Sequence, residues 1–337
     1  MANASGAAAI IDKGIRARAF PGATIETGRH DAVLWNAAFG RFTYADDAPA
    51  VGPDTIYDLA SLTKVIATTT RAMQAIEAGA LSLETRVADR LSAWRGADRD
   101  MVTIADLLEH ASGLTAYLPF FRDHHGRADF ERAICTMPLE YAPRTQSIYS
   151  DLGFILLGFI LADAGFTLAN LGSIVFNPPN DWKSRTTPTE LDLWRGRLIQ
   201  GEVHDENAWA LGGVAGHAGM FGAASAVGSF ARDVLKGLRG ATTFARPETF
   251  ARFARKSTVP GSSRALGWDT MLPTSSCGTG LSARALGHTG FTGTSLWIDP
   301  EQDLYVVLLT NRVHPSRDNN AIQPIRRAVH DEIVASS

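Results

Sequence analysis

The feature of this chain that most limits its fold is the position of its strand-like segments, which lie near both ends of the sequence. Alternating and apolar segments predict strands at 23–26, 32–37, 40–43, 266–271, 282–287, 294–298 and 305–310. A helix over 7–19 precedes the first group, and a helix over 322–334 follows the last. The middle of the chain favours helices and loops, without a convincing ladder of strands. This order predicts one sheet assembled from both ends of the chain.

The same order divides the chain into two regions. We expect a discontinuous sheet domain formed by residues 1–92 and 245–337, and a mostly helical domain inserted between them over residues 93–244. No linker separates the two regions, so we expect them to pack closely, with the active site at their interface. A chain of 337 residues, 45% of them hydrophobic, is sufficient for a core of this size.

The first chemical motif is a serine and a lysine three residues apart. Ser61 and Lys64 stand at the start of a helix predicted over 62–78, which Gly79 ends as a cap. Residues three apart share a helix face, so the lysine amine can reach the serine hydroxyl and activate it for attack on an acyl carbon. Amides at the helix start would stabilise the resulting oxyanion. The alternatives are a helix N-cap serine and a solvated lysine.

Two further motifs place polar side chains directly before an apolar segment, in one case a predicted helix and in the other a predicted strand. They are Tyr149-Ser150-Asp151 and His288-Thr289-Gly290. A serine and a lysine at this spacing are a weak signal when they stand alone. Three motifs in this order are far less frequent by chance, so they favour an enzyme with a nucleophilic serine.

With these motifs the chain resembles the serine β-lactamase and penicillin-binding-protein superfamily, and within it the class C β-lactamase-like hydrolases, which include family VIII-type carboxylesterases and D-amino-acid peptidases. The resemblance covers most of the chain and extends to residues 107–114, 210–216 and 297–300. It implies an α+β fold of the β-lactamase/transpeptidase type, with an antiparallel sheet flanked by helices and an inserted helical domain. It also implies an acyl-enzyme mechanism that needs no cofactor and no metal.

The resemblance assigns the proton transfers to Lys64 and Tyr149, with Ser61 as the nucleophile. Whether Lys64 or Tyr149 accepts the serine proton stays open at the level of the sequence. Asp151 replaces the asparagine that is most common in β-lactamases at this position. It could pair with Lys64 and keep the amine charged, which would favour Tyr149 as the base, or it could cap the helix that follows.

The third motif departs from the Lys-Thr-Gly of typical β-lactamases, where the resemblance assigns the lysine to the substrate carboxylate. His288 is only partly protonated near neutral pH, so anionic antibiotics should bind less well. Thr289 is expected to contact the substrate, and Gly290 permits close approach of the substrate to the backbone. The amides of Phe291 and Ser61 would form the oxyanion hole.

Two other segments have open alternatives. Residues 202–219 are rich in polar side chains and glycine, and either line the acyl-binding cleft or form a loop held by its own hydrogen bonds. A metal site there is disfavoured because adjacent residues do not converge easily on one ion. The aromatic residues Tyr117, Phe120 and Phe121 either form a wall of a substrate pocket or pack in the core.

The composition argues against several classes of partner. A net charge of −3 with interspersed acidic and basic residues indicates neither nucleic acid nor a membrane surface as a ligand. No run of about 18 apolar residues exists to span a bilayer. Residues 1–13 lack the pattern of a secretory signal, which favours a cytoplasmic location, although a chain trimmed of its leader would look the same. Cys135 and Cys277 lack ligand-like spacing, and neither a disulfide framework nor a zinc cluster is expected.

These observations predict a serine hydrolase that acts on small molecules. A carboxylesterase on small esters or amides is favoured by His288, by Asp151 and by the missing export pattern. The alternatives are a β-lactamase or a D-alanyl-D-alanine carboxypeptidase-type penicillin-binding enzyme, and an acylated sensor that does not turn over. The oligomeric state is not predicted.

Overall fold

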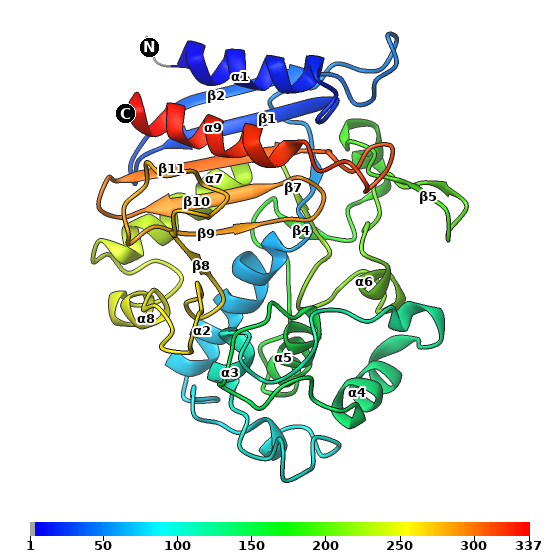
Figure 1. Ribbon diagram of the computed structural model, residues 1–337, viewed down its shortest axis with the longest axis vertical. Coiled ribbons are helices and arrows are strands. Elements are labelled where there is room, and N and C mark those ends of the chain that lie inside the picture. The colour runs from blue at the N-terminus through cyan, green and yellow to red at the C-terminus, as the bar shows by residue number, and fades with distance from the viewer. Residues whose placement is uncertain (1–3) are drawn as a thin grey trace.

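A computed structural model describes residues 4–337 and joins the two ends of the chain in one antiparallel sheet (Figure 1). The strand order is β2-β1-β11-β10-β9-β8. These strands are β1 (Gly22–Gly28), β2 (Val33–Gly40), β8 (Asp269–Thr270), β9 (Leu286–Thr289), β10 (Ser295–Asp299) and β11 (Leu304–Thr310). The first and last strands pair with Ala23 opposite Thr310. The α+β class and the sheet built from both ends are therefore confirmed.

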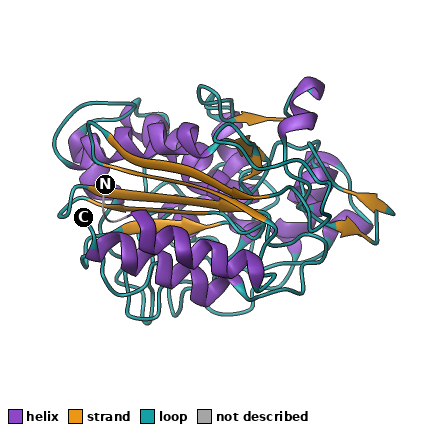
Figure 2. Cartoon of the chain, turned by 90° about the horizontal axis from the view of Figure 1, so that it is seen from above, coloured by secondary structure: helices purple, strands orange, loops and turns teal. Residues whose placement is uncertain are grey.

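Two apolar cores lie on opposite faces of this sheet, because successive side chains of a strand point to opposite faces. In β11, Val306 and Leu308 face the core that is shared with α1 (Ala4–Arg16) and α9 (Ile322–Ala335). Val307 and Leu309 face the larger core, to which α7 (Ala224–Leu238) contributes. Figure 2 shows helices covering both faces of the sheet. A strand buried on both faces reads as a continuous apolar run, which is why β11 was predictable from sequence.

The remaining helices lie mostly beyond one edge of the sheet (Figure 1). They are a π-helical segment Lys64–Thr69, α2 (Thr70–Glu77), α3 (Ile104–Leu108), α4 (Gly126–Thr136), α5 (Asp151–Asp163), α6 (Glu206–Ala210), α8 (Pro247–Phe253) and 3-10 segments Val87–Asp89, Phe120–Arg122 and Asn180–Arg185. Helix α5 is buried over most of its length and packs near the Lys64 segment. Gly79 ends α2 with a positive φ of 71°, as the predicted cap requires.

Several predicted strands differ from the structure. Residues 40–43 form no third strand, and the strand predicted over 282–287 begins only at Leu286. The helical middle contains short strands that were not expected: β4 (Val175–Phe176), β5 (Leu191–Asp192), β6 (Arg197–Leu198) and β7 (Met220–Gly222), with β3 (Tyr57–Asp58) paired to β7. Strands of two or three residues are too short to produce a period-2 pattern. Among the helices described, none has the length and apolar content needed to cross a membrane.

Candidate active site

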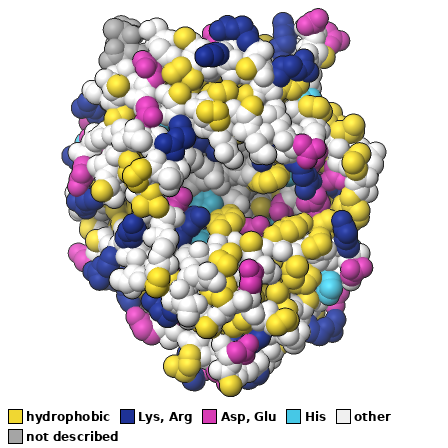
Figure 3. All heavy atoms as spheres, in the orientation of Figure 1, with side chains coloured by type: hydrophobic (Ala, Val, Ile, Leu, Met, Phe, Trp, Pro, Cys, Tyr) yellow, Lys and Arg dark blue, Asp and Glu magenta, His cyan; other side chains and the backbone are white. Residues whose placement is uncertain are grey.

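A cavity of about 570 Å³ opens beside Ser61. Figure 3 shows it as a hollow in the middle of the surface, with histidine and charged side chains at its walls. Residues far apart in the sequence line it, among them Tyr149, His204, His288 and Arg326. The three motifs that the sequence singled out therefore meet at one cavity.

Ser61 lies directly before the first helical turn, and its hydroxyl contacts two proton-carrying side chains. Lys64 donates a hydrogen bond to Ser61 Oγ from Nζ at 3.0 Å, and the Tyr149 hydroxyl donates to the same oxygen at 2.8 Å. The lysine comes from the helical segment that follows Ser61, whereas Tyr149 comes from the loop directly before α5. This geometry allows a proton to pass between the serine and either neighbour.

Lys64 is buried, and its amine has three oxygen neighbours. Besides Ser61, Nζ donates to Asp151 Oδ1 at 2.7 Å and to the carbonyl oxygen of His217 at 3.1 Å. Burial opposes the charged form, but Asp151 and Tyr149 outweigh it and raise the pKa of Lys64 above its ordinary value. Of the two alternatives for Asp151, the geometry supports pairing with Lys64, because the N-cap of α5 is the hydroxyl of Ser150.

Tyr149 packs against His110, a buried residue that follows α3. His110 accepts a hydrogen bond from the Ser150 amide at Nδ1, at 3.0 Å, and its ring centroid lies 4.7 Å from that of Tyr149. Burial, opposed by Lys64 and reinforced by Asp151, raises the pKa of Tyr149 above its ordinary value. The resting phenol therefore keeps its proton at neutral pH.

The turn that presents Ser61 is held in an uncommon conformation. Ala60 has a φ of 46°, a left-handed value that residues with a Cβ rarely adopt. Buried Asp58 stabilises this turn, since its two carboxylate oxygens accept hydrogen bonds from the amides of Ala60 at 2.8 Å and His204 at 2.6 Å. The hydroxyl of Thr292 donates to the carbonyl of Asp58 at 2.7 Å. The turn is thereby tied to the loop that follows β9.

That loop contains Gly290 and Phe291. A Cβ on Gly290 would overlap the Thr294 hydroxyl and lie 2.6 Å from the carbonyl oxygen of Leu59, so only glycine fits. Within the described residues, neither the Phe291 amide nor the Ser61 amide donates a hydrogen bond to another group. Both residues line the same cavity, so their unpaired amides are candidates for binding an oxyanion.

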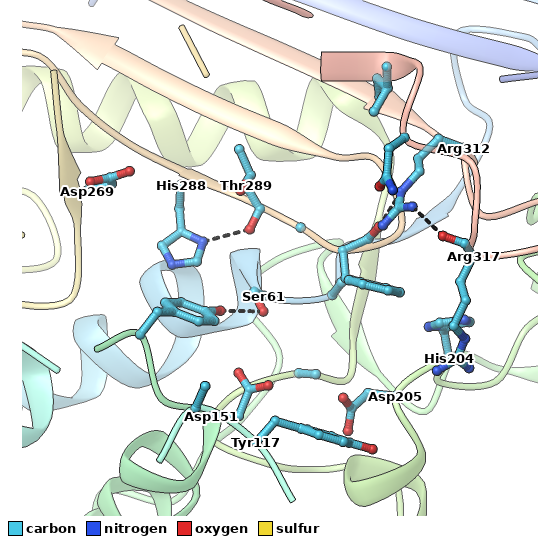
Figure 4. A pocket seen from close by; sticks show the side chains of 18 of the residues that line it. Ser61, Tyr117, Asp151, His204, Asp205, Asp269, His288, Thr289, Arg312 and Arg317 are labelled. Atoms are coloured by element: carbon cyan, nitrogen blue, oxygen red, sulfur yellow. Dashed lines mark hydrogen bonds between the residues drawn. The ribbon is translucent and has the colours of Figure 1, made fainter. Parts of the chain in front are cut away.

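His288 ends close to Tyr149, with ring centroids 5.7 Å apart, and Thr289 lies beside it at the cavity wall (Figure 4). Its Nδ1 lies 2.8 Å from the Thr289 carbonyl oxygen, which only accepts, so this nitrogen carries the proton. Burial lowers the pKa of His288 well below its ordinary value, and Lys64 and Arg264 act in the same direction. The imidazole is therefore neutral at neutral pH and supplies no positive charge to this wall.

Sequence reasoning missed Arg264, whose guanidinium lies 5.2 Å from the centroid of the Tyr149 ring and lines the cavity. Its side chain is 19% exposed, and its nearest carboxylate oxygen, on Asp269, is 3.9 Å away. No motif marks this residue in the sequence, because only tertiary packing brings it to the site.

The segment 202–219 both lines the cavity and is held by its own hydrogen bonds, the two alternatives that the sequence left open. His204, Asp205 and Glu206 line the cavity, and hydrogen bonds within the segment stabilise it. His217 Nε2 lies 2.8 Å from Asp205 Oδ1. Burial opposes ionisation, but His217 prevails and holds the pKa of Asp205 well below its usual range. No group of three or more potential metal ligands occurs among residues 4–337.

The three aromatic residues of the 117–121 loop have different surroundings. Tyr117 lines the cavity opposite His288 (Figure 4). Phe120 packs against Phe130, and Phe121 is buried beside Trp194. The cavity wall that the sequence suggested is thus made by Tyr117 alone of the three.

The sequence of this chain matches a known protein family and a set of relatives. Residues 7–330 match the family model described as Beta-lactamase. A protein of Salmonella gallinarum (strain 287/91 / NCTC 13346), provisionally named a D-alanyl-D-alanine carboxypeptidase, is 30% identical over 318 residues, covering 80% of this chain and 72% of the relative.

Solved structures show the same fold at lower identity. EstCE1, described as a hydrolase with promiscuous acyltransferase activity, superposes with a TM-score of 0.75 at 20% identity, covering 97% of this chain and 98% of its own. A class C beta lactamase from Rhodobacter sphaeroides has a TM-score of 0.75 at 21% identity, with 98% and 99% covered.

Proposed function

Because this chain belongs to the Beta-lactamase family, whose members are serine hydrolases, we propose that it is a carboxylesterase that hydrolyses small esters or amides through an acyl-enzyme on Ser61. The observation that carries the proposal is the pair of hydrogen bonds that Ser61 Oγ receives from Lys64 and Tyr149. With two such neighbours the serine can lose its proton to one of them, and that neighbour can then pass a proton to the leaving group.

In the proposed reaction, Ser61 Oγ attacks the acyl carbon and its proton passes to the Lys64–Tyr149 pair. The amides of Ser61 and Phe291 stabilise the oxyanion. As the bond to the leaving group breaks, Tyr149 returns the proton to the leaving oxygen or nitrogen. Water then attacks the acyl carbon, and the same pair takes a proton from the water and gives it back to Ser61.

Esters are favoured over β-lactam antibiotics by the charge of the wall beside Ser61. A β-lactam carries a carboxylate near its reacting carbonyl, and neutral His288 offers it no cation.

We expect rapid release of p-nitrophenol from p-nitrophenyl butyrate. For a chromogenic cephalosporin we expect kcat/KM to be at least about tenfold lower, since the loss of one charge-assisted hydrogen bond costs this much or more. Initial rates on the two substrates test this. Faster opening of the cephalosporin would overturn the esterase proposal, and a persistent acyl adduct without product would favour a sensor.

A second candidate is a D-alanyl-D-alanine carboxypeptidase. It is supported by the name of the 30% identical relative and by Arg264, which places a cation beside Tyr149 where a terminal carboxylate could bind. Release of D-alanine from a peptide that ends in D-alanyl-D-alanine, faster than ester hydrolysis at equal concentration, would favour this candidate over the esterase.

The kcat/KM for ester hydrolysis is expected to rise with pH. The pKa values of Lys64 and Tyr149 are both raised, so the neutral-pH site holds an ammonium and a phenol, and neither accepts the Ser61 proton. The reactive form has lost one proton from the pair, and its population grows as pH increases. We expect log kcat/KM for p-nitrophenyl butyrate to increase from about pH 6 to about pH 9, after subtraction of spontaneous hydrolysis. A rate that falls over this range would contradict this protonation state.

A further inference from the structure

Much of the exposed apolar surface of this protein is gathered on one hairpin and the helix beside it. Five of the large hydrophobic side chains that are exposed belong to this place: Leu191, Leu193, Trp194 and Leu198 of the β5–β6 hairpin, and Trp209 of α6. Single apolar side chains at a surface are ordinary, but a group of them indicates a contact with another body. We call these five residues the hairpin surface.

The members of the hairpin surface are neighbours in space. Leu191 and Leu198 are cross-strand partners, so their side chains share one face of the hairpin. Leu193 and Trp194 lie in the turn between the strands, and Leu193 is 92% exposed. The ring of Trp194 stands edge to face with that of Trp209, with centroids 5.5 Å apart. Figures 1 and 2 both show the hairpin projecting from the body of the molecule.

The charged side chains of the hairpin are all paired. Asp192 and Arg195 are buried and form an ion pair at 2.8 Å. Arg197 pairs with Glu202 beyond the end of β6. A segment whose charges are paired can leave water at a lower cost than one with a free charge. The hairpin therefore presents an apolar tip and offers no free charge to a charged partner.

The hairpin is fixed to the wall of the active-site cavity. Arg195 donates hydrogen bonds to the carbonyl oxygens of Val203 at 2.8 Å and His204 at 2.5 Å, and His204 lines the cavity. Helix α6 makes a second connection, because its first residue, Glu206, lines the cavity and Trp209 belongs to the hairpin surface. Whatever binds the hairpin surface is thus held beside the cavity that contains Ser61.

The shape and composition of the hairpin surface favour lipid over a protein as its partner. Stable protein interfaces take about 20–30 residues from each side, whereas this surface consists of five side chains on a projecting hairpin. Leucine gains most by leaving water, and tryptophan is enriched where the apolar and polar layers of a membrane meet. The indole nitrogens of Trp194 and Trp209 donate no hydrogen bond to another group within residues 4–337, so they are available to lipid headgroups or water.

We propose that the hairpin surface inserts into the boundary between the headgroups and the acyl chains of a lipid surface, and holds the protein there with its cavity beside the lipid. The net charge of −3 argues against electrostatic attraction to an anionic membrane, but the contact proposed here is apolar. The proposal goes beyond the proposed function and does not depend on it, because the hairpin surface takes no part in the reaction at Ser61.

The test is co-sedimentation of the full chain with sucrose-loaded vesicles of zwitterionic phosphatidylcholine. We expect the wild type to sediment with the vesicles, and Leu193→Ser to have a partition coefficient lower by roughly tenfold or more, because burial of one large apolar side chain changes an equilibrium by about this much. Leu193 is almost fully exposed, so its replacement does not endanger folding. Leu198→Ser should weaken binding as well.

The matched control is Met101→Ser, because Met101 is 74% exposed and lies outside the hairpin surface. It should bind vesicles like the wild type. Ser61→Ala should also bind like the wild type, so the result does not depend on hydrolysis. Initial rates on dissolved p-nitrophenyl butyrate, expected to be the same in Leu193→Ser and the wild type, test the proposed esterase separately.

Three results would overturn the proposal. The first is a wild type that does not sediment with the vesicles. The second is equal binding by the wild type, Leu193→Ser and Leu198→Ser, which would place the lipid contact elsewhere. The third is a wild-type dimer in sedimentation velocity that Leu193→Ser converts to a monomer, without vesicle binding by either protein. That result would assign the hairpin surface to a second copy of the chain.

Discussion

Replacing Ser61 with alanine is expected to lower kcat/KM for p-nitrophenyl butyrate by at least about 10⁴-fold, the scale of loss seen when a nucleophile is removed. The structure gives the reason. Ser61 Oγ is the hydroxyl that contacts both Lys64 Nζ and the Tyr149 hydroxyl, so in the proposed mechanism its removal leaves Lys64 and Tyr149 without a nucleophile to activate. The measurement is the initial rate together with intact-protein mass after exposure to the ester.

The fold should survive this change, because serine at this position caps no helix and alanine fits the same space. We expect a melting temperature within a few degrees of wild type and no acyl adduct. Ser184→Ala is the matched control, since Ser184 is exposed and donates only to the backbone of Asp181. If Ser61→Ala kept a tenth of the wild-type rate or formed the adduct, the assignment of Ser61 as nucleophile would be wrong.

Tyr149→Phe is expected to lower kcat/KM by about 10²- to 10⁴-fold, the range for loss of a general acid or base. Phenylalanine keeps the ring contacts with His110 and Arg264 but removes the hydroxyl that lies 2.8 Å from Ser61 Oγ. Because the pKa of Lys64 is raised, the lysine alone is a poor base at neutral pH. Initial rates across pH should show both the loss and a changed pH dependence.

The control for this prediction is Tyr44→Phe, which removes a hydroxyl that donates to the carbonyl of Arg18 outside the cavity. It should change the rate little. A Tyr149→Phe protein with nearly wild-type kcat/KM would mean that Lys64 transfers the protons without the phenol. Lys64 would then be the base that accepts the Ser61 proton, which is one of the two alternatives that the sequence left open.

The sequence predicted those parts of the fold whose signal is local and long enough to have a period. Strand β11, buried on both faces, and the helix that starts beside Ser61 are examples. The short strands β4 to β7 were not predicted, since two or three residues have no measurable alternation. Their pairing depends on partners distant in the chain, such as the contact of β3 with β7.

Some features of the candidate site were likewise predictable from the sequence, and others were decided only by the tertiary structure. The Ser61–Lys64 pair is a property of helical spacing, so the sequence alone determined it. The choice between two roles for Asp151 was decided by tertiary structure, because Lys64 and Asp151 are 87 residues apart and meet only after packing.

The charges that face the cavity could not be predicted from the sequence either. A histidine at position 288 suggested partial protonation, yet burial keeps it neutral, and the cations that face the cavity come from Arg264, Arg312 and Arg326, which no motif marks. The sequence by itself determined the family, the sheet built from both ends and the choice of Ser61, Lys64 and Tyr149 as candidate catalytic residues, because these follow from local spacing and order. The tertiary structure alone decided protonation and charge placement, because both depend on burial and on neighbours that are distant in the chain.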